Sequence, residues 1–202
     1  MASFYRFYRR LRYGRPIVVV SGLPRSGTSM TMKMLEAGGL EYVSDGVRTA
    51  DEDNPKGYYE DERVKDLEKH HDRSWLKEAR GKAIKIISQL VQSLPEDNNY
   101  QILFMRRDLH EVLASQRKML ERRGEDHDVD DEQMLAMYRS HLEKVEFMLR
   151  YRRHLDAMYI DYRSVINNPR EHADRINHFL GGSLAVDRMA GVVDEQLYRN
   201  RS

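Results

Sequence analysis

Short apolar runs alternate with longer segments of helical periodicity along this chain. Unbroken apolar runs indicate buried strands, and apolar positions three and four residues apart indicate amphipathic helices. The predicted strands are 17–21, 40–43, 83–87, 101–105 and 157–160. The predicted helices are 27–37, 88–94, 109–120, 133–155 and 169–180, with a weakly helical segment at 60–76. Strands that alternate with helices are typical of βαβ units, so we predict an α/β fold with three layers. Helices flank a mostly parallel central sheet of about four or five strands.

The chain has 202 residues, a length that suits one domain over residues 1–202. No internal repeat or low-complexity linker divides it. Its first 15 residues form a lead-in in which aromatic residues alternate with arginines. Such a segment either packs on its own domain or contacts an anionic membrane surface or a partner. We expect the packed arrangement.

Composition narrows the possible partners. The net charge is +1, which provides no overall field to attract nucleic acid. The chain has no cysteine, which excludes disulfides and thiolate metal sites, and no apolar run long enough to span a bilayer. The acidic stretch 126–131 and the adjacent His70 and His71 lack the spacing of metal ligands. We therefore expect a cytoplasmic protein without a metal, without a transmembrane segment and without nucleic-acid binding.

The strongest local signal is the segment 17–29, IVVVSGLPRSGTS. A buried strand passes into a loop between Gly22 and Gly27, and a helix follows. The glycine spacing matches the phosphate-binding P-loop, but Thr28 replaces its lysine and Arg25 supplies a cation earlier. Backbone N–H groups of residues 25–29 at a helix N-terminus are suited to hold a phosphate. The pattern predicts a phosphate site whose chemistry is not ordinary ATP hydrolysis.

Residues 24–29, PRSGTS, resemble the 5′-phosphosulfate-binding loop of sulfotransferases. Residues 107–115, RDLHEVLAS, follow a predicted strand and resemble the 3′-phosphate-binding segment of the same family, with arginine and serine eight positions apart. Ser115 lies two helical turns beyond the strand end, so both side chains can face one ligand. Similar family segments stand at 54–60, 161–162, 168–169 and 179–181. The resemblance covers about residues 17–182 in the correct order.

This resemblance implies a P-loop-like sulfotransferase fold and the donor 3′-phosphoadenosine 5′-phosphosulfate (PAPS). The reaction would move a sulfuryl group to an acceptor hydroxyl or amine, leave 3′-phosphoadenosine 5′-phosphate and need no metal. The implied catalytic cation is Arg25, which would stabilise charge on the bridging oxygen. The implied donor-binding residues are Arg25, Ser26, Gly27, Thr28, Ser29, Arg107, Ser115 and Tyr162.

The acceptor side is less defined. A general base is needed near the nucleophile, and Asp45 and Glu60 are equal candidates. Lys85, on a short apolar strand, either neutralises charge on the sulfuryl oxygens, as its family position implies, or protects an edge strand. Tyr162 either lies near the nucleotide or packs at a strand end. Tyr198, Arg199 and Arg201 are candidates to close over the nucleotide.

Two other functions compete with sulfuryl transfer. Asp161 at the end of an apolar strand imitates a magnesium ligand of a P-loop kinase, although the missing P-loop lysine opposes this function. A non-catalytic nucleotide-binding module is the other alternative. The acceptor remains open among a small molecule, a glycan end, a lipid headgroup and a peptide tyrosine, because acceptor pockets are built from variable loops.

Overall fold

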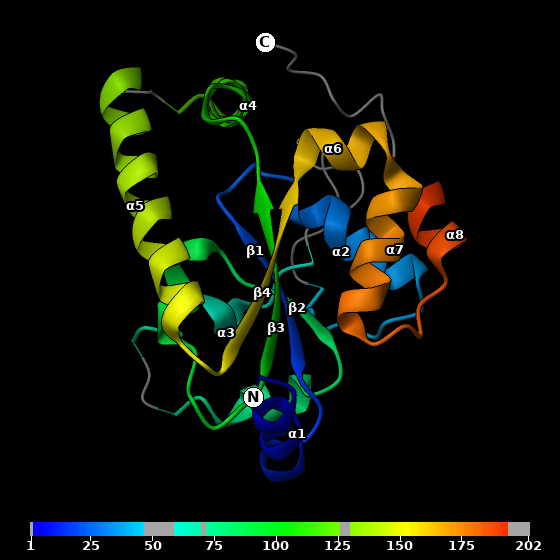
Figure 1. The fold of residues 1–202 in the computed structure, drawn as a ribbon. Helices are drawn as coiled ribbons and strands as arrows, with labels where there is room; N and C mark the ends of the chain where they lie inside the picture. Colours follow the sequence, from blue (N-terminus) through cyan, green and yellow to red (C-terminus); the bar gives the residue numbers. More distant parts are fainter. Residues whose placement is uncertain (1, 47–58, 70–71, 126–129, 194–202) are drawn as a thin grey trace.

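A computed structural model describes residues 2–46, 59–69, 72–125 and 130–193 (Figure 1). The elements in the first half are α1 (Ala2–Tyr13), β1 (Ile17–Gly22), α2 (Thr28–Ala37), α3 (Glu62–Lys65), η1 (Ser74–Ala79), β2 (Ala83–Lys85) and η2 (Ser88–Ser93). The second half contains β3 (Tyr100–Arg106), α4 (Leu109–Arg123), α5 (Asp131–Tyr151), β4 (Leu155–Asp161), α6 (Tyr162–Asn167), α7 (Pro169–Leu180) and α8 (Val186–Gly191).

Four strands form an all-parallel sheet in the order β2-β1-β3-β4, which confirms the predicted α/β class. In register, Val19 of β1 lies beside Ile84 of β2 and Ile102 of β3. After β1 the chain passes to one face of the sheet through α2, and after β3 it passes through α4 to α5 on the other face. The junction between β1 and β3 is therefore a topological switch point, where α/β sheets bind ligands at the carboxyl ends of their strands.

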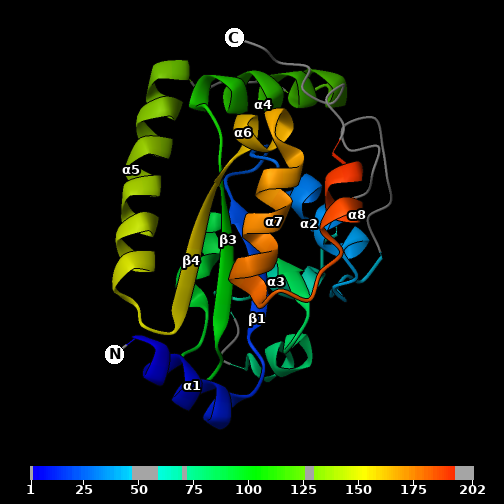
Figure 2. The same cartoon turned by 45° about the vertical axis from the view of Figure 1, so that its right-hand side comes forward.

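Helices cover both faces of the sheet (Figures 1 and 2). One core packs β-strand side chains against α3, η1, η2 and α5, and the other packs the opposite side chains against α2, α6, α7 and α8. Both faces of β1 are covered, so all six of its residues are buried, as its unbroken apolar pattern predicted. In Figure 2, α4 lies across the carboxyl ends of the strands and α1 lies beyond their amino ends.

Several element boundaries differ from the predictions. The predicted strand at 40–43 is wrong, because this segment forms only an isolated bridge between Tyr42 and Ala83. The segment after β2 is a 3-10 helix, and α4 continues to Arg123 and ends at Gly124 in the left-handed conformation. The helix predicted at 133–155 begins at Asp131, capped by the Asp130 carboxylate, and ends at Tyr151. Its last predicted turn instead leads into β4, since sheet pairing outweighs local periodicity there.

Candidate functional site

The turn between β1 and α2 has an unusual backbone. Arg25 has a φ of 67°, in the left-handed region that non-glycine residues seldom adopt. Gly27 has a φ of 102°, and a Cβ at this position would lie 2.5 Å from Cδ2 of Tyr162. No side chain caps the N-terminus of α2 at Gly27. The turn therefore brings the positive end of α2 to the carboxyl edge of the sheet, as an anion site requires.

Two serine hydroxyls of this turn are buried without a hydrogen-bond partner in the described part of the chain. They are Ser21 Oγ at the end of β1 and Ser26 Oγ in the turn itself. Ser26 packs so closely on the strand end that a Cβ on Gly22 would lie 2.5 Å from its Oγ. Buried hydroxyls are seldom left without a partner in folded proteins. Together with the uncapped helix, Ser26 fits a turn that closes on an external group.

Arg25 joins this turn to α4. Its Nε donates to Ser115 Oγ at 3.0 Å, and its carbonyl accepts from Nη1 of Arg107 at 3.1 Å. Arg25 thus contacts two other predicted donor-binding residues, up to 90 positions away in the sequence, at the β1–β3 junction.

A buried carboxylate holds the second arginine in place. Glu111, on the first turn of α4, is 3% exposed and accepts from Arg107 Nε at 2.9 Å. Its other oxygen accepts from Nη2 of Arg163 at 3.3 Å. The Arg107 guanidinium also lies 4.4 Å from the centre of the Tyr162 ring, a cation–π distance. Tyr162 therefore packs against both Gly27 and Arg107, and links the two phosphate-binding candidates.

Lys85 lies on the other side of the turn, at the end of edge strand β2. Its Nζ contacts Ser29 Oγ at 3.4 Å and Glu60 Oε1 at 3.2 Å, and its side chain is 10% exposed. Removing a lysine from water is costly unless it is paired. The pairing with Glu60 satisfies this condition and connects Glu60 to the phosphate-binding turn.

The two candidate bases have different surroundings. Asp45 accepts from the backbone N–H of Glu62 at 2.6 Å, while Glu60 is the carboxylate that contacts Lys85. The residue before Glu60, Tyr59, has a φ of 53°, and its hydroxyl donates to Oε2 of Glu36 at 2.5 Å. Burial raises the pKa of Tyr59, and the Glu36 carboxylate raises it further, so this phenol stays protonated as a donor. Tyr59 thereby fixes the backbone that carries Glu60.

Sequence reasoning missed three residues of this arrangement: Glu111, Arg163 and Tyr59. The signal for Glu111 was its position four residues after Arg107, a spacing that pairs opposite charges on one helical turn. Arg163 and Tyr59 left no comparable pattern. The predicted segments 54–58, 70–71 and 126–129, and Tyr198, Arg199 and Arg201, lie outside the described residues.

The residues that the structure describes contain neither a metal-ligand cluster nor a membrane-spanning helix. Among these residues, no group of three or more histidine, aspartate or glutamate side chains is arranged to hold a metal ion. Within the same ranges, no helix combines the length and the apolar character needed to cross a bilayer.

Comparison with known proteins identifies the family to which this chain belongs. Residues 15–201 match the family model of the sulfotransferase domain, and the chain belongs to this family. This membership confirms the resemblance found in the sequence. A search among curated proteins found no match.

One solved structure supports the fold, and two others are less similar. The sulfotransferase domain of the olefin synthase from Synechococcus PCC 7002 has a TM-score of 0.54 and 15% identity, over 93% of this chain and 84% of that domain. A sulfotransferase from Alicyclobacillus acidocaldarius has a TM-score of 0.45 and 15% identity, over 86% of this chain and 83% of that protein. A sugar kinase from Janibacter sp. HTCC2649 also has a TM-score of 0.45, with 13% identity over 89% of this chain and 99% of that protein.

Proposed function

We propose that this chain is a sulfotransferase that moves a sulfuryl group from PAPS to an acceptor hydroxyl or amine. The observation that carries the proposal is the contact of Arg25 with Ser115 and Arg107 at the β1–β3 junction. A donor with a phosphate at each end of its ribose needs two anion sites within one nucleotide's reach. The turn before α2 and the start of α4 supply these two sites.

The residues of the turn fit the 5′ end of the donor. Backbone N–H groups at the start of α2 would bind the phosphate oxygens, and the hydroxyls of Thr28 and Ser29 would add donors. The orphaned Ser26 hydroxyl is a further donor within the same turn. The Tyr162 ring packs directly on Gly27, where a Cβ would lie 2.5 Å from Cδ2, so the ring and the backbone of the turn lie side by side.

Arg107 and Ser115 fit the 3′-phosphate. The Arg107 side chain is 8% exposed and already oriented by Glu111, so little rotamer entropy is lost when it binds an anion. The guanidinium of Arg163, on the other oxygen of Glu111, provides a second cation beside the same carboxylate. Glu111 thus contacts two guanidinium groups, and guanidinium groups bind phosphate through charge-assisted hydrogen bonds.

When bound, the donor supplies a sulfuryl group whose bond to the bridging oxygen breaks as the bond to the acceptor forms. Arg25 would stabilise the charge that develops on this oxygen, since a fixed cation stabilises the transition state more than the ground state. Its guanidinium does not give up a proton, so its contribution is electrostatic.

We propose Glu60 as the general base and Lys85 as the cation that faces the sulfuryl oxygens. Lys85 connects the candidate base to Ser29 of the phosphate-binding turn, which supports a position beside the transferred group. Glu60 would take the proton of the acceptor. Asp45 is a positioning residue in this proposal, because its carboxylate is used to fix the backbone N–H of Glu62.

The surroundings of Asp161 weaken the kinase alternative. Its Oδ1 accepts from the backbone N–H of Ser164 at 2.8 Å and from the Ser164 hydroxyl at 2.7 Å. This carboxylate therefore caps α6, a role that explains its place at the end of β4 without a magnesium ion.

A thermal-shift screen separates the candidate functions. We expect 3′-phosphoadenosine 5′-phosphate to raise the melting temperature in the presence of a chelator, because a ligand of the native state stabilises it by mass action. A rise with ATP that needs magnesium would support the kinase instead. No rise with either nucleotide would contradict both proposals.

A further inference from the structure

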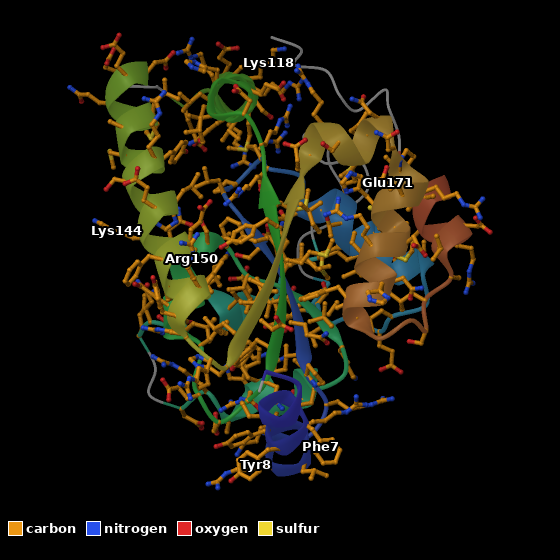
Figure 3. The ribbon with its side chains drawn as sticks, in the orientation of Figure 1. Phe7, Tyr8, Lys118, Lys144, Arg150 and Glu171 are labelled. Atoms are coloured by element: carbon orange, nitrogen blue, oxygen red, sulfur yellow. The ribbon has the colours of Figure 1, made fainter. Side chains whose placement is uncertain are left out.

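Helix α1 presents an apolar stripe to solvent at the end of the molecule opposite the candidate site. Phe7, Tyr8 and Leu11 are 59%, 50% and 72% exposed. Phe7 and Leu11 are four residues apart and so share a face of the helix. Figure 3 shows Phe7 and Tyr8 on the outer side of α1, directed away from the sheet.

The charge around this stripe has one sign. The described side chains of helix α1 include Arg9, Arg10 and Arg12 and no acidic residue. Arg10 and Arg12 are exposed and stand on either side of Leu11 in the sequence, so they flank the stripe around the helix. Glu96 and Asp97 belong to the loop behind α1, on which the inner side of the helix rests.

The inner side of α1 is fixed to the domain, so the outward orientation of the stripe is a stable feature. Arg9 Nε donates to Asn99 Oδ1 at 2.9 Å, and Arg9 Nη2 donates to the carbonyls of Glu96 and Asn98, each at 2.7 Å. Asn99 returns a bond to the Arg9 carbonyl at 3.0 Å. The Arg9 guanidinium also lies 4.6 Å from the centre of the Tyr13 ring.

We propose that the outer face of α1 binds an anionic lipid surface, with Phe7, Tyr8 and Leu11 in the interface and Arg10 and Arg12 beside the headgroups. An apolar stripe between arginines is the arrangement by which a helix lies in the plane of a membrane surface. The attraction of arginines to anionic lipid adds to the burial of the apolar side chains.

Helix α5 shows why the charge pattern favours lipid at α1. Phe147 and Tyr151 are as exposed as the α1 residues, at 66% and 63%, and their rings lie 4.5 Å apart. Lys144 and Arg150 flank Phe147 on this helix, but Glu143, four residues before Phe147, lies beside the same stripe, so the charge around it has both signs. Exposed apolar area alone is common on proteins, and only α1 combines it with unopposed positive charge among the helices described.

This orientation bears on the acceptor. With α1 on the membrane, the carboxyl edge of the sheet and the Arg25 site lie at the far end of the molecule (Figure 2). A lipid headgroup of the same bilayer is then out of reach, and the acceptor comes from the aqueous side.

Vesicle co-sedimentation tests the proposal. The full chain is mixed with phosphatidylcholine vesicles with and without phosphatidylserine. We expect binding to the anionic vesicles that weakens when salt is raised from about 0.1 M to about 1 M, where the screening length falls from about 10 Å to about 3 Å. The double substitutions F7S/L11S and R10E/R12E should each weaken the binding by at least about tenfold.

Matched controls are F147S/Y151S on α5 and R122E/R123E at the end of α4, which make the same chemical changes at other exposed positions. Both should bind vesicles like the parent chain, and circular dichroism should show all variants folded. Absence of binding by the parent chain, or equal loss in the controls, would overturn the proposal. Sedimentation equilibrium that shows an α1-dependent dimer without vesicle binding would assign this face to a second copy and also overturn it. The nucleotide-binding tests are independent of either result.

Discussion

The two sides of the phosphate-binding turn differ in how completely they are built. On the arginine side, Arg107 and Glu111 are 8% and 3% exposed and bonded at 2.9 Å. On the lysine side, the Lys85–Glu60 contact is longer, at 3.2 Å, and Glu60 is 27% exposed. The proposed donor site is therefore preorganised, because a buried carboxylate already orients its arginine. The lysine side keeps a partly exposed carboxylate, as expected of a site completed by the acceptor.

The largest effect should come from Arg25, which contacts the arginine side and is the proposed catalytic cation. Arg25→Ala should lower kcat by at least about a hundredfold, the scale for loss of one preorganised donor. Arg25→Lys should recover part of the rate, because the charge returns without the guanidinium geometry. Steady-state kinetics with a saturating donor measures both. Unchanged turnover in Arg25→Ala would remove this residue from the mechanism.

The second effect concerns donor affinity on the arginine side. Arg107→Ala should weaken the binding of 3′-phosphoadenosine 5′-phosphate by at least about tenfold, since a hydrogen bond to a charged group contributes about 1.5–3 kcal/mol. Glu111→Gln should weaken this binding less, because the arginine remains but loses its orientation. Calorimetric titration checks both variants. Equal affinity in all three proteins would mean that this ion pair serves the fold alone.

The third effect tests the backbone of the turn. Gly27→Ala should lower the free energy of unfolding by about 2 kcal/mol, because the backbone is left-handed and the Cβ meets Tyr162. Gly181→Ala is the matched control, with a φ of 109° and open space around it. Urea denaturation should show a larger loss for Gly27. Equal losses would show that the contact with Tyr162 costs nothing.

The fourth effect belongs to the lysine side. Lys85→Met should lower kcat by about tenfold, less than Arg25→Ala, because water screens a partly exposed pair. Affinity for 3′-phosphoadenosine 5′-phosphate should stay within about twofold. Glu60→Gln should show the same pattern and Asp45→Asn a smaller one. If Asp45→Asn abolishes turnover while Glu60→Gln does not, the assignment of the base is reversed.

The smallest effect is on pH dependence near the lysine side. His141 shares a hydrogen bond of 2.8 Å with Ser88, three residues after Lys85. Burial lowers the pKa of His141, and Lys144 lowers it further. A depressed pKa stabilises the fold above the unfolded value of about 6.5, and this contribution is lost as pH falls through the folded value. As pH is lowered from 8 to 5, the melting temperature should fall more steeply for the parent chain than for His141→Asn. An equal fall in both proteins would show that His141 does not contribute to the pH dependence of stability.

The same contrast separates what the sequence could predict from what it could not. The phosphate-binding turn and the arginine side depend on local patterns: a buried strand, two glycines at fixed spacing, and an arginine and a serine on one helical stretch. These patterns predicted which residues meet at the β1–β3 junction. The lysine side depends on Tyr59, the residue before Glu60, which has a left-handed backbone and a hydrogen bond to Glu36. Contacts of this kind join distant segments, and neither spacing nor periodicity records them.

The strand predicted at 40–43 failed for a related reason. Its apolar pattern fits a strand, but β2 is only three residues long and offers a single bridge at Tyr42. Whether an apolar run pairs depends on the length of its neighbour, which lies 40 residues away in the sequence.

Calorimetric titration of the parent chain and Arg107→Ala, in a chelator, with 3′-phosphoadenosine 5′-phosphate and with adenosine 5′-monophosphate tests whether Arg107 binds the 3′-phosphate. We expect the parent chain to bind the bisphosphate at least about tenfold more tightly than the monophosphate, and Arg107→Ala to lose most of this preference. Equal binding of the two nucleotides by the parent chain, or a preference that survives in Arg107→Ala, would contradict this role of Arg107.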